Sequence, residues 1–319
     1  MNSIQSEHLP GRAPDTARAF TLIELVVVLA VLALLLVTLA PALARTRPTA
    51  HRFQCLNNLN QIQNAIVIYA HDYRDLFPPN PDDPGNDTPG HHWVSNVDQQ
   101  SPFAYDPAPL LDPTHSLVTT YLSGNIKLFK CPADTRQGPY QAVGAINPSL
   151  AGKVLPAARS ISMSEAVGSV CPQYKTCSGG HGGAPRPPTN GPWLDGNHAN
   201  GCPTLVWSTF GQTTSFRKMS PAMVFILCDE NSYSINDGSL ATSAVPQGGP
   251  GGTARLIDYP ACWHNGGAGF AFCDGHAEIH KWLGTAIQIS PSTGYTQPSS
   301  PLDWIDYSWL AQHSSTLDH

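Results

Sequence analysis

The chain has 319 residues, of which 41% are hydrophobic and 13% charged, which is the composition of a globular protein rather than a disordered one. Its formal net charge is −6 and its Lys and Arg residues are scattered, so there is no basic stripe for a phosphate backbone, and nucleic acid is not an expected partner. Gly and Pro gather at 78–113, 179–196 and 246–252, which we predict to be surface loops.

The N-terminal segment contains an uncharged apolar run at 25–43, about as long as a helix that crosses a membrane. A polar leader precedes the run, unlike an ordinary signal peptide, whose shorter apolar region is followed by a cleavage site. One acidic residue, Glu24, stands at the start of the run, where a carboxylate in hydrocarbon needs a partner. We predict that the run is a membrane-spanning helix, with an uncleaved membrane anchor as the alternative.

The residues RAFTLIEL at 18–25 resemble the cleavage and methylation motif of type IV prepilins and type II secretion pseudopilins. The resemblance implies that a prepilin peptidase cuts between Ala19 and Phe20 and methylates Phe20. We therefore predict a leader at 1–19 and a transmembrane helix at 20–44. It also implies that Glu24 pairs with the N-terminal amine of a neighbouring subunit, because opposite charges relieve each other's desolvation cost. That family has Gly where this chain has Ala19, so we expect slower processing.

The same resemblance implies a location and partners. The chain is expected to be a single-pass protein of the inner membrane, with its N-terminus in the cytoplasm and its head in the periplasm or at the cell surface. Its expected partners are the prepilin peptidase, the inner membrane and other pilin or pseudopilin subunits.

A second, amphipathic helix is predicted at 45–76, because apolar residues recur in steps of three and four. These residues form one face: Phe53, Leu56, Leu59, Ile62, Ile66, Tyr69 and Tyr73. The other face carries uncharged polar residues, among them Asn58 and Gln63. Pro48 is expected to interrupt the helix, so that the span and the amphipathic part are two helices in tandem.

The phrases CLNNLNQI at 55–62 and CPAD at 131–134 resemble a second family, the pilin-like proteins with a DUF1559-type head. From this resemblance we expect a disulfide between Cys55 and Cys131, with two buried free thiols as the alternative. The pairing of six other cysteines stays open: Cys171, Cys177, Cys202, Cys228, Cys262 and Cys273. Cys171 and Cys177, together with His181, resemble a set of zinc ligands. Their spacing is looser than usual for zinc ligands, so disulfides are favoured.

The globular head is predicted at 77–319, with Pro/Gly-rich loops. Apolar runs at 223–228 and 269–273 are typical of strands, and Asp274-Gly275 after the second run indicates the turn of a hairpin. The predicted fold class is therefore α+β and pilin-like: a long N-terminal helix, part membrane span and part amphipathic, packs on an antiparallel β-sheet head.

His264 is followed by nine residues and then by Asp274-Gly275, which resembles the H-X9-DG signature that closes the DUF1559-type family. Strand ends are predicted to bring Asp229, His264 and Asp274 together at one sheet edge. Two roles are open: hydrogen bonds that brace the hairpin, or the binding of a divalent cation. We favour the brace, because spacing alone does not show that metal ligands converge. The weak candidates for metal ligands are Asp229, Glu230, His264, Asp274 and His276. No other cofactor is expected.

No catalytic constellation is present in the sequence, which lacks a Gly-x-Ser-x-Gly elbow, a phosphate-binding loop and a His-Glu-x-x-His motif, so an enzyme is not expected. We predict a pseudopilin or minor-pilin-like subunit, assembled into or displayed on a filament of the type II secretion or type IV pilus kind. The alternative is a membrane-tethered module that binds glycans or proteins, supported by Trp93, Trp193 and Trp207 in loops. A hydrolase on the same anchor is less favoured.

Overall fold

The computed structural model describes residues 21–80, 90, 92–94, 104–141, 148–169, 191–197, 207–249, 252–288 and 295–317, without the side chains of 38–47. The chain divides into two compact units, Met1–Arg47 and Pro48–His319. Helix α1 (Leu22–Asp72) contributes to both. The expected interruption at Pro48 is wrong, because helical backbone is assigned throughout α1. A proline removes only one N–H donor, and a long helix can continue beyond it.

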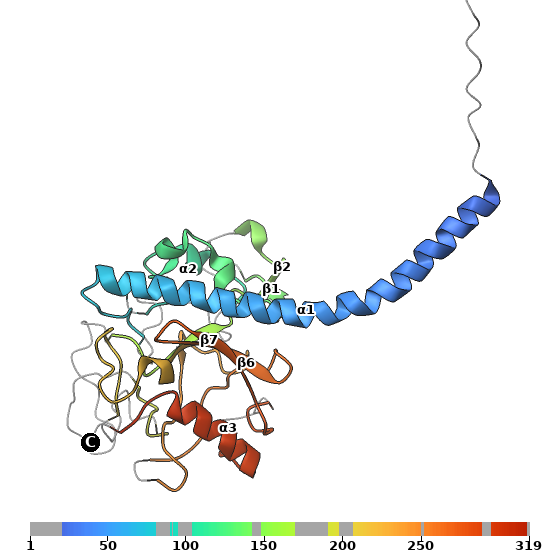
Figure 1. The fold of residues 1–319 in the computed structure, drawn as a ribbon. Coiled ribbons are helices and arrows are strands. Elements are labelled where there is room, and N and C mark those ends of the chain that lie inside the picture. Colours follow the sequence, from blue (N-terminus) through green and yellow to red (C-terminus); the bar gives the residue numbers. More distant parts are fainter. Residues whose placement is uncertain are drawn as a thin grey trace, which may run out of the picture. The chain divides into compact units, whose positions relative to one another are not determined.

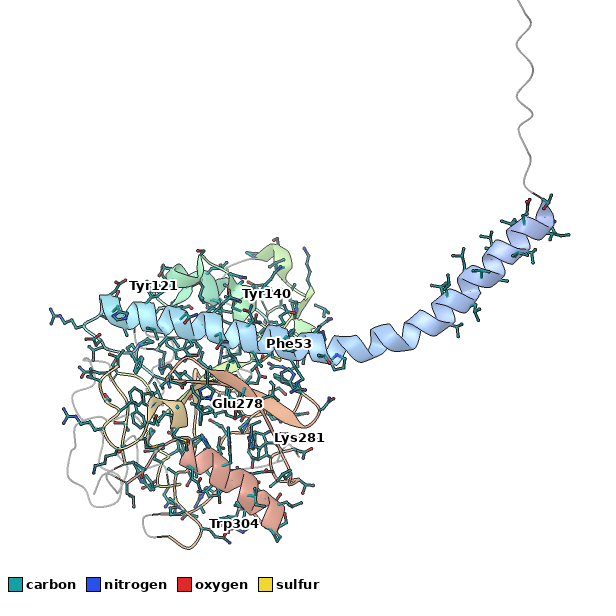
Figure 2. All side chains as sticks on the ribbon, in the orientation of Figure 1. Phe53, Tyr121, Tyr140, Glu278, Lys281 and Trp304 are labelled. Atoms are coloured by element: carbon teal, nitrogen blue, oxygen red, sulfur yellow. The ribbon has the colours of Figure 1, made fainter. Side chains whose placement is uncertain are left out.

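The described part of the first unit is the N-terminal section of α1. Its large apolar side chains from Leu22 to Val37 are between 45% and 79% exposed, and they project on all sides of the helix (Figure 2). Within the part of the chain that the structure describes, no helix is both long enough and apolar enough to cross a membrane. The membrane span expected at 20–44 therefore stays a prediction.

The second unit is built around a five-stranded sheet. The strands lie in the order β5 (Ser239–Leu240), β3 (Ile161–Ser164), β4 (Phe225–Asp229), β6 (Gly267–Phe272) and β7 (Ala277–Lys281). Every neighbouring pair is antiparallel except β3 with β5, which is parallel. The predicted hairpin is the β6–β7 pair, and the two predicted strands are neighbours. The α+β class is confirmed.

The sheet lies between two helices, and this explains why β4 is buried along its whole length. The part of α1 that begins at Pro48 covers one face of the sheet, and α3 (Pro301–Gln312) covers the other (Figure 1). Leu227 packs in the cluster on the α1 side, and Phe270 packs in the cluster on the α3 side. Hydrophobic burial on both faces is the main source of the stability of the unit.

The packing face of α1 differs from the predicted one at its ends. Phe53 (Figure 2) and Tyr73 are 70% and 52% exposed. The face consists instead of the following buried residues: Cys55, Asn58, Leu59, Ile62, Gln63, Ala65, Ile66, Tyr69 and Ala70. Asn58 and Gln63, expected on the outer face, therefore lie inside. The face extends to Asn58 and Gln63 because their side-chain amides donate to the backbone carbonyls of Lys130 and Phe272.

Shorter elements complete the second unit: α2 (Ala108–Leu111), η1 (Thr119–Leu122), η2 (Ile126–Phe129), β1 (Gln137–Pro139), η3 (Pro148–Leu150), β2 (Val154–Pro156) and η4 (Pro221–Met223). Strands β1 and β2 form a separate antiparallel ribbon. Helix α3 begins with a capping box in which the Ser300 hydroxyl accepts from the Asp303 backbone and the Asp303 carboxylate accepts from the Ser300 backbone.

Candidate metal centre

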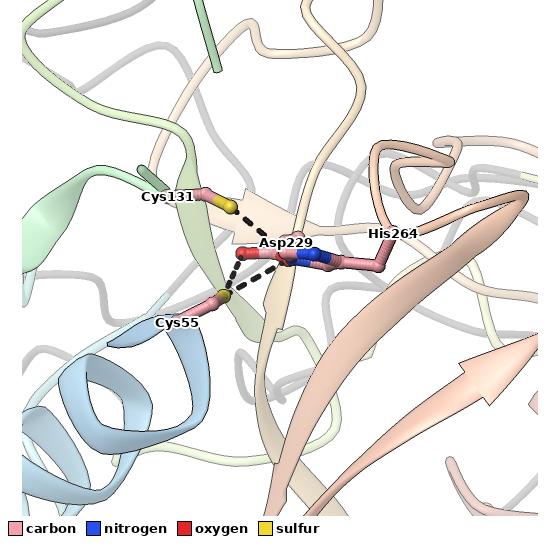
Figure 3. A group of neighbouring side chains, drawn as sticks. All are labelled: Cys55, Cys131, Asp229 and His264. Carbon is pink, nitrogen blue, oxygen red and sulfur yellow. Dashed lines mark hydrogen bonds and ion pairs between the residues drawn. The ribbon is translucent and has the colours of Figure 1, made fainter. Parts of the chain in front are cut away.

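Four buried side chains from distant parts of the sequence meet between α1 and the sheet: Cys55, Cys131, Asp229 and His264 (Figure 3). We call these residues the four-residue cluster. Each offers one ligand atom, and these atoms all lie within 4.8 Å of one another. None of the four residues is more than 5% exposed. The cluster is therefore closed to solvent and consists of groups that bind metals.

Asp229 is at the centre of the contacts. The Cys55 thiol donates to both carboxylate oxygens of Asp229, with Sγ–O distances of 3.1 Å. The Nε2 atom of His264 lies 3.1 Å from Oδ2 of Asp229 and 3.3 Å from Sγ of Cys131. The backbone N–H of Gly269 also donates to Oδ2 over 3.1 Å.

The two cysteines are placed by different local structures. Cys55 lies on the packing face of α1, one turn before Leu59. Cys131 begins a tight turn in which the Asp134 N–H donates to the Cys131 carbonyl over 3.0 Å, with Pro132 at the position that proline favours. Asp134 also forms an ion pair with Arg136 at 2.8 Å. The Cys-Pro-x-Asp phrase is therefore a turn that presents Cys131 to the cluster.

Asp229 and His264 are placed by the sheet. Asp229 is the last residue of β4, and His264 precedes a turn whose two central residues, Asn265 and Gly266, have φ values of 57° and 78°. Asn and Gly tolerate this left-handed backbone best, and the pair is typical of tight hairpin turns. The His264 N–H closes the turn on the Gly267 carbonyl at 3.1 Å. The turn chemistry thus directs His264 toward Asp229.

Small residues on β6 make room for the cluster. Because side chains alternate across a strand, Gly267, Gly269 and Ala271 share the face toward α1. A Cβ atom at Gly269 would lie 2.9 Å from Cδ1 of Leu59 and 3.2 Å from both Asp229 Oδ2 and Cys55 Sγ. The missing side chain at Gly269 therefore lets α1 approach closely enough for Cys55 to reach Asp229.

The contacts within the cluster shift the pKa values of its members. Burial lowers the pKa of His264, but hydrogen bonds to Asp229 and Cys131 outweigh burial and raise it to about 9. The hydrogen bond between the two thiols lowers the pKa of Cys131. The same bond, followed by burial, raises the pKa of Cys55. Without a bound ion, the cluster therefore favours the protonated imidazole at His264, and Cys131 is the more acidic of the two thiols.

The disulfide expected between Cys55 and Cys131 is absent. Both are free thiols, as are the other described cysteines, Cys228, Cys262 and Cys273. The expected proximity of the two residues is found, but each sulfur also contacts Asp229 or His264, and the two are not bonded to each other. Cys171, Cys177, His181 and Cys202 lie outside the described residues, and so do Ala19 and Phe20.

Asp274 does not join Asp229 and His264, which corrects the expected convergence of the three. It lies in the β6–β7 turn, where Oδ1 accepts from the His276 backbone at 3.1 Å and lies 2.6 Å from its Nδ1. Gly275 has a φ of 104° there. His264 stands before β6 and Asp274 after it, and five steps along a strand span about 17 Å. His264 and Asp274 therefore do not brace each other.

Glu230 also points away from the cluster. Its carboxylate accepts from the Ser162 hydroxyl on β3, and it is fully buried. Burial raises its pKa to about 7, although nearby Arg159 opposes the rise. Of the weak candidates for metal ligands named from the sequence, only Asp229 and His264 belong to the four-residue cluster. The other two members of the cluster are Cys55 and Cys131.

In the sequence, the thiol pair and the signature residues are two separate features. No spacing motif connects them, because Asp229 and His264 are 35 residues apart and Cys55 lies 174 residues before Asp229. Only the packing of α1 on the sheet unites them. One feature of the sequence indicates that Cys55 and His264 are related: both belong to phrases that resemble the DUF1559-type family.

The chain combines a long, partly exposed N-terminal helix with a sheet of mostly antiparallel strands, and the second part of the helix packs on that sheet. Residues 15–40 match the prokaryotic N-terminal methylation motif, and residues 44–170 match the family described as Protein of unknown function (DUF1559). Searches of curated proteins and of solved structures gave no match. The resemblance to prepilin-like DUF1559 proteins is confirmed, and the methylation motif supports a type IV pilin-like protein. The DUF1559 match includes Cys55 and Cys131, whereas Asp229 and His264 lie beyond it.

Proposed function

We propose that the chain is a pseudopilin or minor-pilin-like structural subunit. In this proposal a prepilin peptidase removes residues 1–19 and methylates Phe20. The mature subunit is anchored in the inner membrane by the N-terminal section of α1, with its head outside the cytoplasm, and it joins a filament of the type II secretion or type IV pilus kind. The methylation motif at 15–40 supports the processing step.

The observation that carries the assembly step is the exposed apolar section of α1. Its large side chains from Leu22 to Val37 are exposed on all sides of the helix. A helix that is apolar all round needs an apolar environment, either lipid or the same segment of neighbouring subunits. Filament assembly provides both environments in turn, because a subunit leaves the bilayer as its helix joins the helices of other copies.

Glu24 has a local role that the assembly experiment must separate from a charge-pairing role. Its Oε2 atom accepts from the Thr21 N–H at 2.9 Å and from the Thr21 hydroxyl at 2.8 Å, and the Glu24 N–H donates back to that hydroxyl at 3.3 Å. These reciprocal bonds are a capping box at the start of α1. A loss of assembly in Glu24→Ala would therefore have two explanations, a lost charge or a lost cap.

Processing is tested by co-expression with a prepilin peptidase, followed by intact-mass analysis. We expect a mature chain that begins with N-methylated Phe20, and Ala19→Gly should raise the fraction processed. A chain that keeps Met1 in the presence of active peptidase would contradict the proposal.

Assembly is tested by a matched pair of variants that separates charge from capping. Glu24→Gln keeps an acceptor for the Thr21 N–H but removes the charge, whereas Thr21→Ala weakens the cap and keeps the charge. We expect Glu24→Gln to be excluded from filaments and Thr21→Ala to be incorporated, as measured by immunoblotting of sheared filament fractions. Normal incorporation of Glu24→Gln would refute the pairing role.

The alternative of a binding module loses its support from exposed aromatic residues. Trp93 and Trp207 are buried, and the Trp93 indole N–H donates to the Gly238 carbonyl at 2.8 Å. Trp193 is half-buried against Tyr295, with ring centroids 4.7 Å apart. These tryptophans hold loops onto the core, and they do not form an exposed platform for a glycan.

A further inference from the structure

We propose that the four-residue cluster binds one Zn²⁺ in a closed structural site that ties α1 to the sheet. The inference is independent of filament assembly, because every ligand lies in the unit Pro48–His319. The site consists of two thiolates, one imidazole nitrogen and one carboxylate oxygen.

The distances suit a tetrahedral ion. Zinc binds sulfur at about 2.3 Å and nitrogen or oxygen at about 2.0 Å, so the edges of its coordination tetrahedron are roughly 3.3 to 3.8 Å. Three contacts between ligand atoms of the cluster, at 3.1 to 3.3 Å, lie at or just below the short end of that range, and no two of the four ligand atoms are more than 4.8 Å apart. An ion at the centre would need the contacting ligand atoms to move slightly apart and the most distant pair to move closer together, which side-chain rotation provides.

The chemistry of the donors selects zinc over the common hard cations. Calcium and magnesium take oxygen ligands, and a site with two sulfurs and one nitrogen suits neither. Two sulfurs, one nitrogen and one oxygen in tetrahedral arrangement are typical of zinc. All four positions are supplied by the protein, and the residues are buried, so no open position remains for substrate or water. The site is structural and not catalytic.

A bound dication would offset two of the three negative charges that its ligands carry. The Asp229 carboxylate is inaccessible to solvent, and its contacts within the cluster are a thiol, an imidazole and the Gly269 N–H. In the absence of an ion, this buried carboxylate is paired with His264 at 3.1 Å. With zinc bound, two thiolates and the carboxylate face two positive charges, and His264 binds as the neutral imidazole. The Gly269 N–H then orients the ligating carboxylate, as second-shell donors do in metal sites.

The structure also offers a route to the site. A cleft of about 310 Å³ borders Cys131 and is lined in part by Asn58, Lys130 and Asp134. It opens on the side of the Cys-Pro-x-Asp turn, which carries only one of the four ligands. Movement of this turn would admit the ion while Cys55, Asp229 and His264 stay in place on α1 and beside the sheet.

The ion would connect segments that are far apart in the sequence. Helix α1, the turn at 131–134, the end of β4 and the turn before β6 each contribute one ligand. Because the unfolded chain holds no such preformed site, zinc would stabilise the folded unit, and a chelator would destabilise it.

The direct test is metal analysis of the full chain, purified in detergent without chelators. We expect about one zinc per chain, and X-ray absorption should report two sulfur and two nitrogen or oxygen ligands. Cobalt substitution should give the intense charge-transfer absorption of thiolate ligands. Removal of zinc by a chelator should lower the melting temperature, and added zinc should restore it.

Matched variants locate the ion. Cys55→Ser and His264→Ala should lose the zinc, whereas Cys273→Ser and His276→Ala, which change the same residue types outside the cluster, should keep it. Cys171→Ser should also keep it, which excludes the looser set of Cys171, Cys177 and His181. If a cluster variant fails to fold, the absorption spectrum of the wild type still decides the question.

Three results would overturn the proposal. The first is a Cys55–Cys131 disulfide in peptide mapping of the native protein, because the sulfurs would then be unable to ligate. The second is a chain with free thiols that takes up no zinc from a titration. The third is zinc that is retained by Cys55→Ser and lost by Cys171→Ser.

Discussion

Replacing Gly269 by alanine tests the close approach of α1 to the sheet. The new methyl group would point at α1 and would meet Leu59 Cδ1 at 2.9 Å, with Asp229 Oδ2 and Cys55 Sγ at 3.2 Å. Carbon atoms pack best at roughly 3.5 to 4.0 Å, so Leu59 must move by about 0.6 to 1 Å. Leu59 is fully buried and has little space for that movement.

The expected cost follows from two opposing effects. Overpacking a buried site costs about 1 to 3 kcal/mol. Alanine also recovers about 0.5 to 1 kcal/mol, because glycine loses more backbone freedom than alanine when it is fixed in a strand. The net destabilisation of Gly269→Ala should therefore be centred on about 1.3 kcal/mol, with limits of about 0 and 2.5 kcal/mol.

Chemical denaturation of Gly269→Ala and two other glycine variants provides the assay. Gly267→Ala should cost more, because its Cβ would lie 2.4 Å from the His280 carbonyl oxygen, and backbone cannot move aside. Gly211→Ala should be close to neutral, since its nearest contact would be 3.4 Å. If Gly269→Ala were as stable as the wild type while Gly267→Ala was destabilised, the reasoning about the approach of α1 would be refuted.

Two further predictions concern the α3 side of the sheet. Burial and then His313 lower the pKa of His280 from 6.5 to about 4, so the unfolded chain binds more protons between these values. The wild type should lose stability as the pH falls through that range, and His280→Phe, which retains a ring to stack on Trp309, should lose less, as measured by melting temperature against pH. Burial raises the pKa of Asp303, but hydrogen bonds from Ala286 and others outweigh it and hold the pKa below its ordinary 3.8. Asp303→Asn should cost about 1 to 3 kcal/mol in denaturant titrations at neutral pH, and the cost should shrink in acid, where the wild-type carboxylate is protonated; a constant cost would contradict this account.

Much of the fold follows from local signals in the sequence. The β4 run predicts a strand because a strand covered on both faces is continuously apolar, and Asp274-Gly275 predicts the β6–β7 turn because a left-handed backbone favours Gly at that position. The glycines of β6 are less readable. Their role is to make room for the helix that packs against them, and nothing near β6 in the sequence identifies that helix.

The sequence identifies the residues of the candidate metal centre separately but does not predict that they form one site. The H-X9-DG spacing equals a turn plus the length of β6, so it separates His264 from Asp274 and cannot bring them together. This separation of His264 from Asp274 can be predicted from the rise per residue of a strand alone. The proximity of His264 to Cys55 cannot be predicted from the sequence, because it depends on which face of α1 packs on the sheet and on how closely α1 approaches the sheet.

The polar residues of α1 show how this face is selected. The helix has no charged residue between Phe53 and His71, although a solvated helix face is normally rich in charge. Two of its polar residues are buried, and each reaches a backbone carbonyl of the head: Asn58 donates to Lys130 at 3.2 Å, and Gln63 donates to Phe272. Apolar contacts alone tolerate rotation of a helix, because burial is not directional. Hydrogen bonds to fixed carbonyls do not tolerate it, so Asn58 and Gln63 hold α1 in the orientation that keeps Cys55 against Asp229.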